Sequence, residues 1–137
     1  MKTNLLTLAA FLLVLAFLAS HFPRQPWTPT RILGSLIFLP SVALLILARL
    51  QLGRSFSVGA EARALVTSGL YSKIRNPIYV FGALAIGSGI LVLGRPRLLW
   101  TLVLLVPLQI YRMRKEENVL AAKFGEEYWA YKARTWF

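Results

Sequence analysis

Four long apolar runs constrain this chain more than any other feature. They cover about residues 4–20, 31–50, 77–94 and 98–111. Apolar runs of this kind are typical of helices that cross a bilayer, because a helix satisfies its own backbone polar groups. The 137 residues are 57% hydrophobic and only 15% charged, whereas soluble domains average about 45–50% and about 25%. We therefore expect an all-α, polytopic membrane protein with about four transmembrane helices in a single domain, residues 1–137.

The ends of these runs carry basic residues. Arg31 and Arg49 bracket the second run, and a charge at the bilayer centre costs at least about 2.5–3.5 kcal/mol, so both arginines mark its limits. The first run follows Lys2. It matches either a retained span or a secretory signal, and we expect the span. Pro40 and Pro107 are predicted to bend the helices that contain them.

The third and fourth runs are joined by the turn at 94–97, which predicts an antiparallel helix hairpin. Small residues recur at four-residue spacing in the third run, as Ala83 with Gly87 and Ala85 with Gly89. This spacing lets helix backbones approach closely. A loop at 51–76 precedes the hairpin, and a polar tail at 112–137 follows it with a helix, a predicted break near Gly125 and a second short helix.

The net charge of +11 is distributed in a way that predicts topology. Placing both termini inside leaves four of the sixteen basic residues outside, Arg24, Arg31, Arg95 and Arg97. This bias favours a multi-pass protein with cytoplasmic termini, and it puts the loop and the tail on one face. Because the cations flank apolar runs, we expect anionic membrane lipid rather than nucleic acid as their partner. The chain has no cysteine and one histidine, so we expect no metal site.

Residues 65–82 carry the clearest local signal. Asn76 is a favoured residue for the N-cap of a helix, and Pro77 suits the first helical position. A helix should begin here, with Arg75 beside its positive end. Free N–H groups next to a guanidinium form an anion site, although a capped helix that follows a basic residue by chance has the same pattern.

In the predicted hairpin the start of the third run lies beside the end of the fourth. Arg112, Glu116 and Glu117 should therefore face the Arg75–Asn76–Pro77 helix start. Arg112 and Glu116 are spaced i,i+4 and can pair, while adjacent glutamates point about 100° apart on a helix. The simpler alternative is a solvated helix with mixed charges.

Two motifs resemble a known family. LVTSGLYSKIRNPIYVFG, followed by an apolar hairpin and EENVLAAKFGEEYWAYKAR, is similar to the integral-membrane methyltransferases of the isoprenylcysteine carboxyl methyltransferase and phospholipid methyltransferase group. The resemblance covers about residues 50–134. Leu70 stands where the family often has proline, Asn76 where it often has histidine, and Gly82 lies one residue later than in the family pattern.

The resemblance implies transfer of a methyl group from S-adenosylmethionine to a lipid-like or prenylcysteine-like acceptor. The residues that it implies for cofactor binding are Tyr71, Arg75, Asn76, Pro77, Tyr79 and Gly82. Those that it implies for catalysis, with Arg112 and one glutamate orienting the acceptor, are Arg112, Glu116 and Glu117.

Two other functions fit the same sequence. A membrane reductase that binds NADPH on this face is one, and a non-catalytic membrane adaptor or small-molecule carrier is the other. The methyl acceptor is also open between prenylcysteine, a phospholipid amine and a small lipophilic thiol or amine. The sequence does not determine the oligomeric state.

Overall fold

The computed structural model describes residues 12–13, 16–17, 19–20, 24, 26–53 and 65–136. All regular structure in these residues is helical, and they contain no strand, which agrees with the predicted all-α class. The α-helices are α2 (Pro29–Leu52), α3 (Pro77–Val92), α4 (Trp100–Phe124) and α5 (Glu126–Arg134), with short 3-10 helices η3 (Gly69–Ser72) and η4 (Pro96–Leu99). Most of the predicted first span, 4–20, lies outside the described residues.

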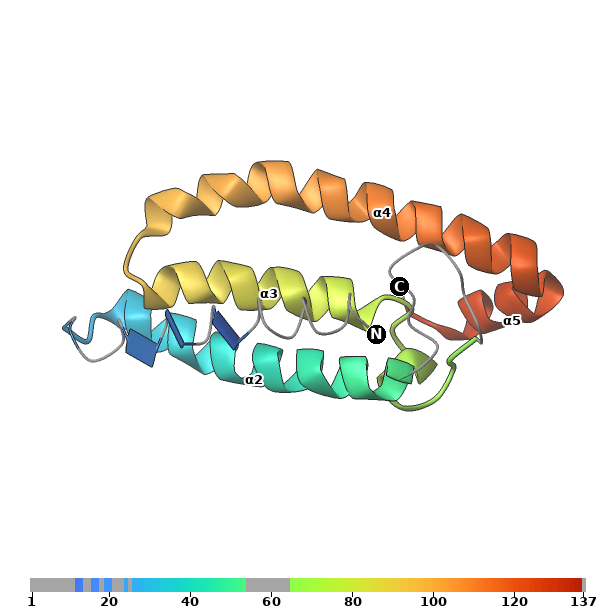
Figure 1. Ribbon diagram of the computed structural model, residues 1–137, viewed down its shortest axis with the longest axis horizontal. Coiled ribbons are helices and arrows are strands. Elements are labelled where there is room, and N and C mark those ends of the chain that lie inside the picture. The colour runs from blue at the N-terminus through green and yellow to red at the C-terminus, as the bar shows by residue number, and fades with distance from the viewer. Residues whose placement is uncertain are drawn as a thin grey trace.

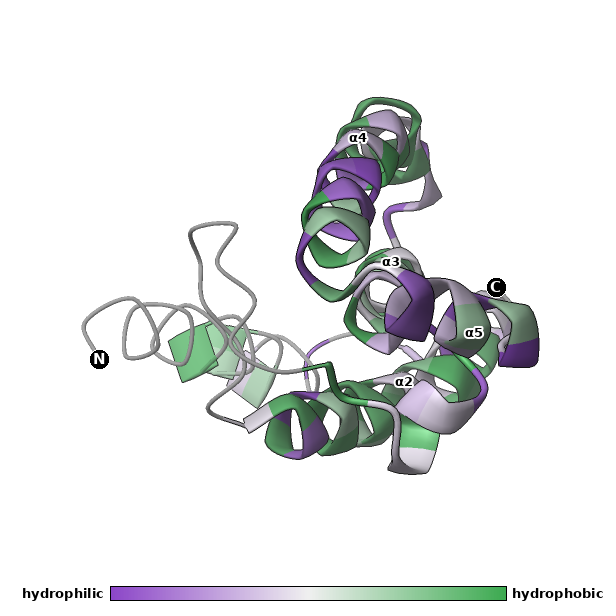
Figure 2. Cartoon of the chain, turned by 90° about the vertical axis from the view of Figure 1, so that its right-hand side faces the viewer, coloured by the Kyte–Doolittle hydropathy of each residue, from purple (hydrophilic) through white to green (hydrophobic). Residues whose placement is uncertain are grey.

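The three long helices form a stack in which neighbours are antiparallel. Helix α3 lies between α2 and α4, and α5 folds back at the end where α3 begins (Figures 1 and 2). The end of α2, the start of α3 and the last turns of α4 therefore meet at one end of the molecule. The predicted hairpin of the third and fourth runs is present as α3, η4 and α4.

Helix α2 is well defined at both ends. The Thr28 side chain caps it by accepting a hydrogen bond from the Arg31 backbone N–H at 3.2 Å, Pro29 is its first residue, and it ends at Gly53, whose φ is +53°. Pro40 lies inside the helix without ending it. Its 24 residues correspond to about 36 Å at about 1.5 Å per residue, which is sufficient for a hydrocarbon core of about 30 Å.

Helix α2 is the one described helix that is both long and apolar enough to cross a membrane. The prediction of about four spans is thus met in part. Helix α3 is apolar but has only 16 residues, and it ends at Val92 rather than at residue 94. Helix α4 continues from the predicted fourth run into the tail, because nothing in residues 100–124 interrupts its backbone hydrogen bonding except Pro107, which lies within the helix.

Close packing of α2 on α3 depends on glycine. A Cβ atom on Gly34 would lie 2.7 Å from the Leu91 Cβ and 2.9 Å from the Val92 backbone nitrogen. A Cβ on Gly89 would lie 3.3 Å from the Phe38 ring. The small residues of the third run therefore do allow close helix packing, and for Gly89 the partner is α2.

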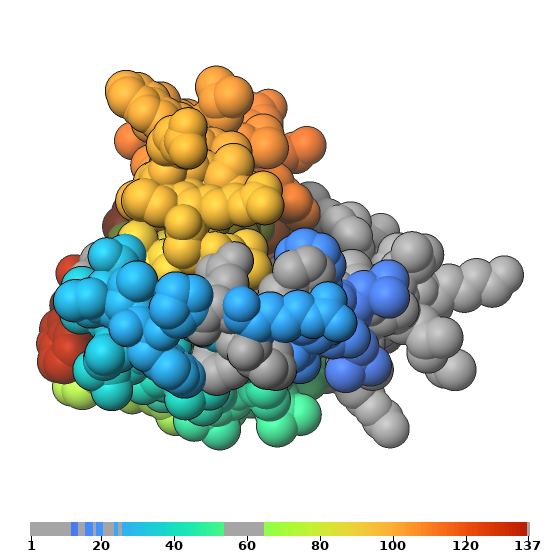
Figure 3. Space-filling model, turned by 90° about the vertical axis from the view of Figure 1, so that its left-hand side faces the viewer, coloured from blue at the N-terminus to red at the C-terminus, as the bar shows by residue number. Residues whose placement is uncertain are grey.

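Helix α4 packs differently, since it has no buried residue. Many of its apolar side chains are exposed, among them Trp100 at 77% and Leu104 at 80%. The beginning of α4 stands as a ridge above the rest of the molecule (Figure 3). Helix α2 also carries exposed apolar residues, among them Leu36 at 67% and Leu39 at 69%. Exposed apolar surface of this extent marks a site of contact with membrane lipid or with another protein. The predicted break is present at Gly125, whose φ is +54°.

Candidate active site between the helix ends

The start of α3 is fixed by its backbone. Asn76 occupies the N-cap position and Pro77 is the first helical residue, as predicted. The Asn76 carbonyl accepts hydrogen bonds from the backbone N–H groups of Tyr79 at 3.1 Å and Val80 at 3.2 Å. The predicted side-chain cap is wrong, because the Asn76 side chain makes no capping bond. Its Nδ2 instead donates to Glu117 Oε1 at 3.0 Å, since a carboxylate is the stronger acceptor.

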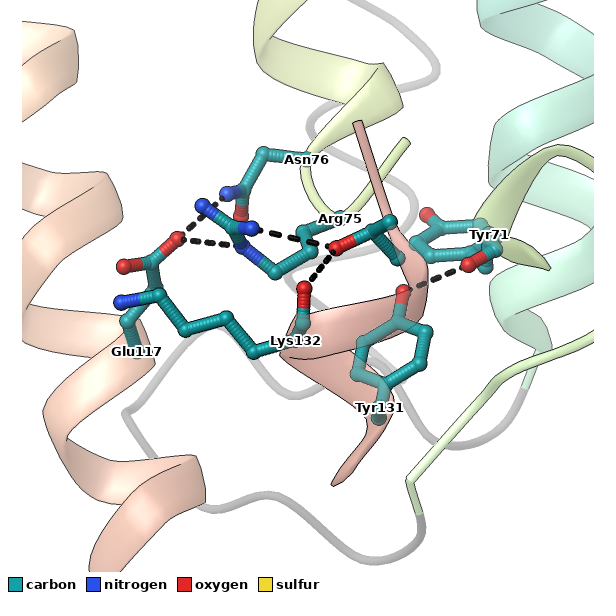
Figure 4. Close-up of polar contacts among 7 residues, drawn as sticks. Tyr71, Arg75, Asn76, Glu117, Tyr131 and Lys132 are labelled. Carbon is teal, nitrogen blue, oxygen red and sulfur yellow. Dashed lines mark hydrogen bonds and ion pairs between the residues drawn. The ribbon is translucent and has the colours of Figure 1, made fainter. Parts of the chain in front are cut away.

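Glu117 joins α4 to the loop before α3. Its Oε1 also accepts from Arg75 Nε at 3.2 Å, in an ion pair whose side chains are 17% and 15% exposed. The Arg75 guanidinium donates in addition to Thr135 Oγ1 at 3.1 Å. Figure 4 shows Arg75 between Glu117 on one side and the residues after α5 on the other. One guanidinium thus holds α4 and the tail against the same loop.

Glu116 contacts α3 itself. Its Oε1 accepts a hydrogen bond from the Tyr79 hydroxyl. The pairing with Arg112 that the i,i+4 spacing allows is not among the described contacts of Glu116, and the Arg112 side chain is exposed. The phenol provides Glu116 with a partner away from solvent, whereas an exposed ion pair with Arg112 would add only about 0.2–1 kcal/mol.

Tyr71 lies away from the two glutamates, in the junction where the end of α2, η3 and α5 meet. It is buried, and its hydroxyl donates to the Ala48 carbonyl of α2 at 3.3 Å. Its own carbonyl accepts from the Tyr131 hydroxyl of α5 at 2.7 Å. Tyr71 therefore connects α2, η3 and α5, and its hydroxyl is engaged by α2 rather than by either glutamate.

Buried tyrosines keep their protons in this region. Burial raises the pKa of Tyr71 well above its ordinary value, and the neighbouring Tyr131 adds to the rise. Burial likewise raises the pKa of Tyr131 to about 12 and that of Tyr128 above its ordinary value. At neutral pH all three phenols are uncharged, and the hydroxyls of Tyr71 and Tyr131 donate hydrogen bonds.

Gly82 opens a space next to this cluster. A Cβ atom built on Gly82 would have no heavy atom within 4 Å. Gly82 follows Tyr79 by three residues, so the two lie on one side of α3. Pro77, between them and the loop, is fully buried. The first turn of α3 is thus bonded to α4 through Asn76 and Tyr79, and the open space lies one turn further along α3, at Gly82.

The structure brings together five of the nine residues predicted for the site, Arg75, Asn76, Tyr79, Glu116 and Glu117. It also adds contacts that the sequence analysis missed. Thr135 binds Arg75, Gln51 Oε1 accepts from the Leu70 N–H at 2.8 Å, and the Trp136 N–H donates to the Lys73 carbonyl at 2.7 Å. These contacts join segments 19–63 positions apart, and no local pattern signals them.

The described residues form an all-helical fold with one helix long and apolar enough to cross a membrane, and a guanidinium, an amide, a phenol and two carboxylates meet where its helices end. The sequence profile of the phospholipid methyltransferase family matches residues 29–127. The chain belongs to this family, and the match contains all nine residues predicted for the site. No curated protein and no solved structure matches the chain.

Proposed function

We propose that the protein is an S-adenosylmethionine-dependent methyltransferase whose acceptor is a lipid-like or prenylcysteine-like amphiphile at the cytoplasmic membrane face. The observation that carries this proposal is the meeting of Arg75, Asn76 and Tyr79 with Glu116 and Glu117 within the family match. The cluster lies at a helix end, where a polar ligand and a lipid chain can be bound side by side.

The residues present fit the charges of this cofactor. The guanidinium of Arg75 suits its carboxylate. Glu117 suits its amino group or its ribose hydroxyls. The open side of α3 at Gly82 leaves room beside these groups. When bound, S-adenosylmethionine supplies a methyl group that its sulfonium activates for transfer. Tyr71 supports this site indirectly, because it fixes the loop that carries Arg75.

The protein's part in the reaction is to position the reactants. Arg112 and Glu116, one turn apart on α4, are the groups that we assign to orienting the acceptor head. Tyr79 holds Glu116 in a fixed place, so its carboxylate is oriented before the acceptor binds. Orientation of two reactants in this manner can correspond to an effective concentration of about 10⁵–10⁸ M. Burial of Pro77 and Tyr71 keeps water out of the junction behind the site.

The acceptor's apolar tail would reach the site from the bilayer. Exposed apolar side chains recur along α4 from Trp100 to Ile110, six residues before Glu116, and this helix has no buried residue. This arrangement favours an acceptor with a membrane-embedded tail over a freely soluble one. It also agrees with the multi-pass topology and cytoplasmic termini that the basic residues predict.

Binding and transfer by the purified full chain test the proposal. We expect calorimetry to detect S-adenosylmethionine binding, and we expect labelled methyl groups to appear on at least one lipid-like acceptor in a mass-spectrometric screen. Glu117→Ala should abolish binding, whereas Glu127→Ala, which removes an exposed glutamate of α5, should not. Absence of binding by the wild type, equal binding by Glu117→Ala, or thermal stabilisation by NADPH in place of S-adenosylmethionine would each refute it.

A further inference from the structure

One buried hydroxyl in the tail has no partner. Tyr128 is 1% exposed, and its hydroxyl oxygen makes no hydrogen bond within the described part of the chain. Leaving a polar group buried and unsatisfied destabilises the folded chain. The neighbouring Tyr131 is 3% exposed but donates to the Tyr71 carbonyl. A phenylalanine would fill the same position as Tyr128 without this cost, so the hydroxyl needs an explanation.

Its surroundings identify the group that it could serve. Tyr128 and Tyr131 are three residues apart on the buried side of α5, which is held to the loop by the Tyr131–Tyr71 and Thr135–Arg75 contacts. After burial, the largest influences on the pKa of Tyr128 are the charge of Glu117, which raises it, and that of Arg75, which lowers it. The geometry agrees, because Thr135, at the end of the same helix, accepts from Arg75, and Arg75 in turn pairs with Glu117, so the buried side of α5 is held at this ion pair.

Glu117 has room for another donor. Arg75 Nε and Asn76 Nδ2 both donate to Oε1, and no donor among the described residues uses Oε2. Arg75 is also the residue that the proposed function assigns to the cofactor carboxylate. A guanidinium that turns toward a ligand weakens its bond to Glu117, and a carboxylate that loses its cation in a largely buried place needs a replacement donor.

We propose that Tyr128 is a positioning residue of the donor site, whose hydroxyl donates to Glu117 when a bound carboxylate draws Arg75 away. This inference rests on the proposed function. In the free protein the Tyr128 hydroxyl has no hydrogen-bond partner. In the complex its hydrogen bond holds the Glu117 carboxylate in the position in which this carboxylate contacts the ligand. The Tyr128 hydroxyl therefore destabilises the free protein relative to a variant without it, and it stabilises the complex with the ligand.

Two tyrosine variants of the full chain, purified in detergent, separate this role from a structural one. Without ligand, Tyr128→Phe should unfold at a temperature equal to or above that of the wild type, because it removes an unsatisfied group. Tyr131→Phe, the matched control, should unfold about 2–8 °C lower, because it removes a hydrogen bond that is satisfied in the folded chain. A clear loss of stability in free Tyr128→Phe would show that its hydroxyl already has a partner, and this would overturn the proposal.

Calorimetry with S-adenosylmethionine completes the test. Tyr128→Phe should bind about tenfold more weakly than the wild type, since hydrogen bonds to charged groups contribute about 1.5–3 kcal/mol. In a Glu117→Gln background with measurable binding at high ligand concentration, the same change should have less than half of this effect. Equal affinity of Tyr128→Phe and wild type, or equal effects in both backgrounds, would refute the positioning role alone. A wild type that does not bind would refute the proposed function and this inference with it.

Discussion

Glu116 and Glu117 are adjacent on α4 but bind different parts of the α3 region. Glu117 accepts from Arg75 and Asn76, so it fixes the loop before the helix. Glu116 accepts from Tyr79, so it fixes the first turn of the helix itself. The turn of about 100° between neighbouring helical residues explains how two consecutive carboxylates reach two partners. Both contacts cross between helices that otherwise pack loosely, because α4 has no buried residue.

Tyr79→Phe tests how much one of these contacts stabilises the hairpin. The change leaves a half-buried carboxylate without its phenol donor, which we expect to lower the free energy of unfolding by about 1–3 kcal/mol. Denaturant titration of the detergent-solubilised chain measures it. Tyr111→Phe is the matched control: Tyr111 is 66% exposed on the same helix as Glu116 and should change stability by less than about 0.5 kcal/mol. Equal effects of the two variants would mean that the Tyr79–Glu116 bond contributes nothing.

Alkaline pH should release the tail through Tyr131. Its folded-state pKa is about 12, mainly because of burial, with Arg75 opposing the shift and Tyr128 adding to it. The unfolded chain loses this proton near pH 10, about the ordinary value. The contribution of Tyr131 to stability is therefore complete below pH 10 and is lost as the pH rises toward 12. Between pH 8 and pH 12 the free energy of unfolding should fall more steeply for the wild type than for Tyr131→Phe. Parallel curves would contradict this assignment.

The sequence predicted the residues of this cluster better than their bonds. The helix start at Asn76–Pro77 follows from local dihedral preferences, and the approach of Glu116 and Glu117 follows from a hairpin with a short turn. The choice of partners did not follow. Asn76 donates to Glu117 instead of capping its own helix, and Tyr79 takes the place expected for Arg112 on Glu116. Such choices depend on distances of a few tenths of an ångström between helices, which periodicity does not encode.

At the scale of the helices, substitution by alanine should have opposite effects on stability at two glycines: Gly34 of α2, which packs against α3, and Gly82 of α3, which faces open space. A Cβ on Gly34 would be 2.9 Å from the backbone nitrogen of Val92, which has little freedom to move. Gly34→Ala should therefore destabilise by about 1–3 kcal/mol. Gly82→Ala meets no atom within 4 Å and should stabilise the helix by about 0.5–1 kcal/mol.

Thermal unfolding of the two glycine variants gives the sign of each effect, and calorimetry adds a functional readout. If the space beside Gly82 receives the cofactor, Gly82→Ala will unfold at a higher temperature yet bind S-adenosylmethionine more weakly than the wild type. A Gly34→Ala protein as stable as the wild type would show that α2 and α3 are not in close contact in solution.

Helix boundaries were predictable where a residue with special backbone geometry sets them. Pro77 begins α3 and Gly125 ends α4 with positive φ, both as predicted, whereas α2 runs over Pro29–Leu52 and exceeds the predicted run 31–50 at both ends. The end of the fourth run at residue 111 was predicted from polarity alone, and α4 passes through it to Phe124. A change from apolar to charged residues marks a change of surroundings and not the end of a helix.

At the scale of the whole molecule, α3 is the element on which the topology depends. Its 16 residues correspond to about 24 Å, less than the thickness of about 30 Å of a hydrocarbon core. A hairpin of α3 and α4 that spanned the membrane would need a locally thinned bilayer, whereas a hairpin that enters the bilayer and returns would not. Both arrangements keep the site at one end, because the Lys73–Trp136 and Arg75–Thr135 bonds join the loop to the tail.

Single cysteines distinguish these arrangements, because the chain has none of its own. Cysteines at the exposed positions Ser72 and Ala133 should react together with a membrane-impermeant maleimide, and only in inverted vesicles if this face is cytoplasmic. A cysteine at Arg97, in the turn at the other end of α3, should react from the opposite side if the hairpin spans. Reaction of positions 72 and 133 from opposite sides would contradict the bonded junction itself. Protection of position 97 on both sides would instead mean that the hairpin is re-entrant, in which case the short α3 holds the site near the lipid headgroups and the acceptor needs to cross no more than one leaflet.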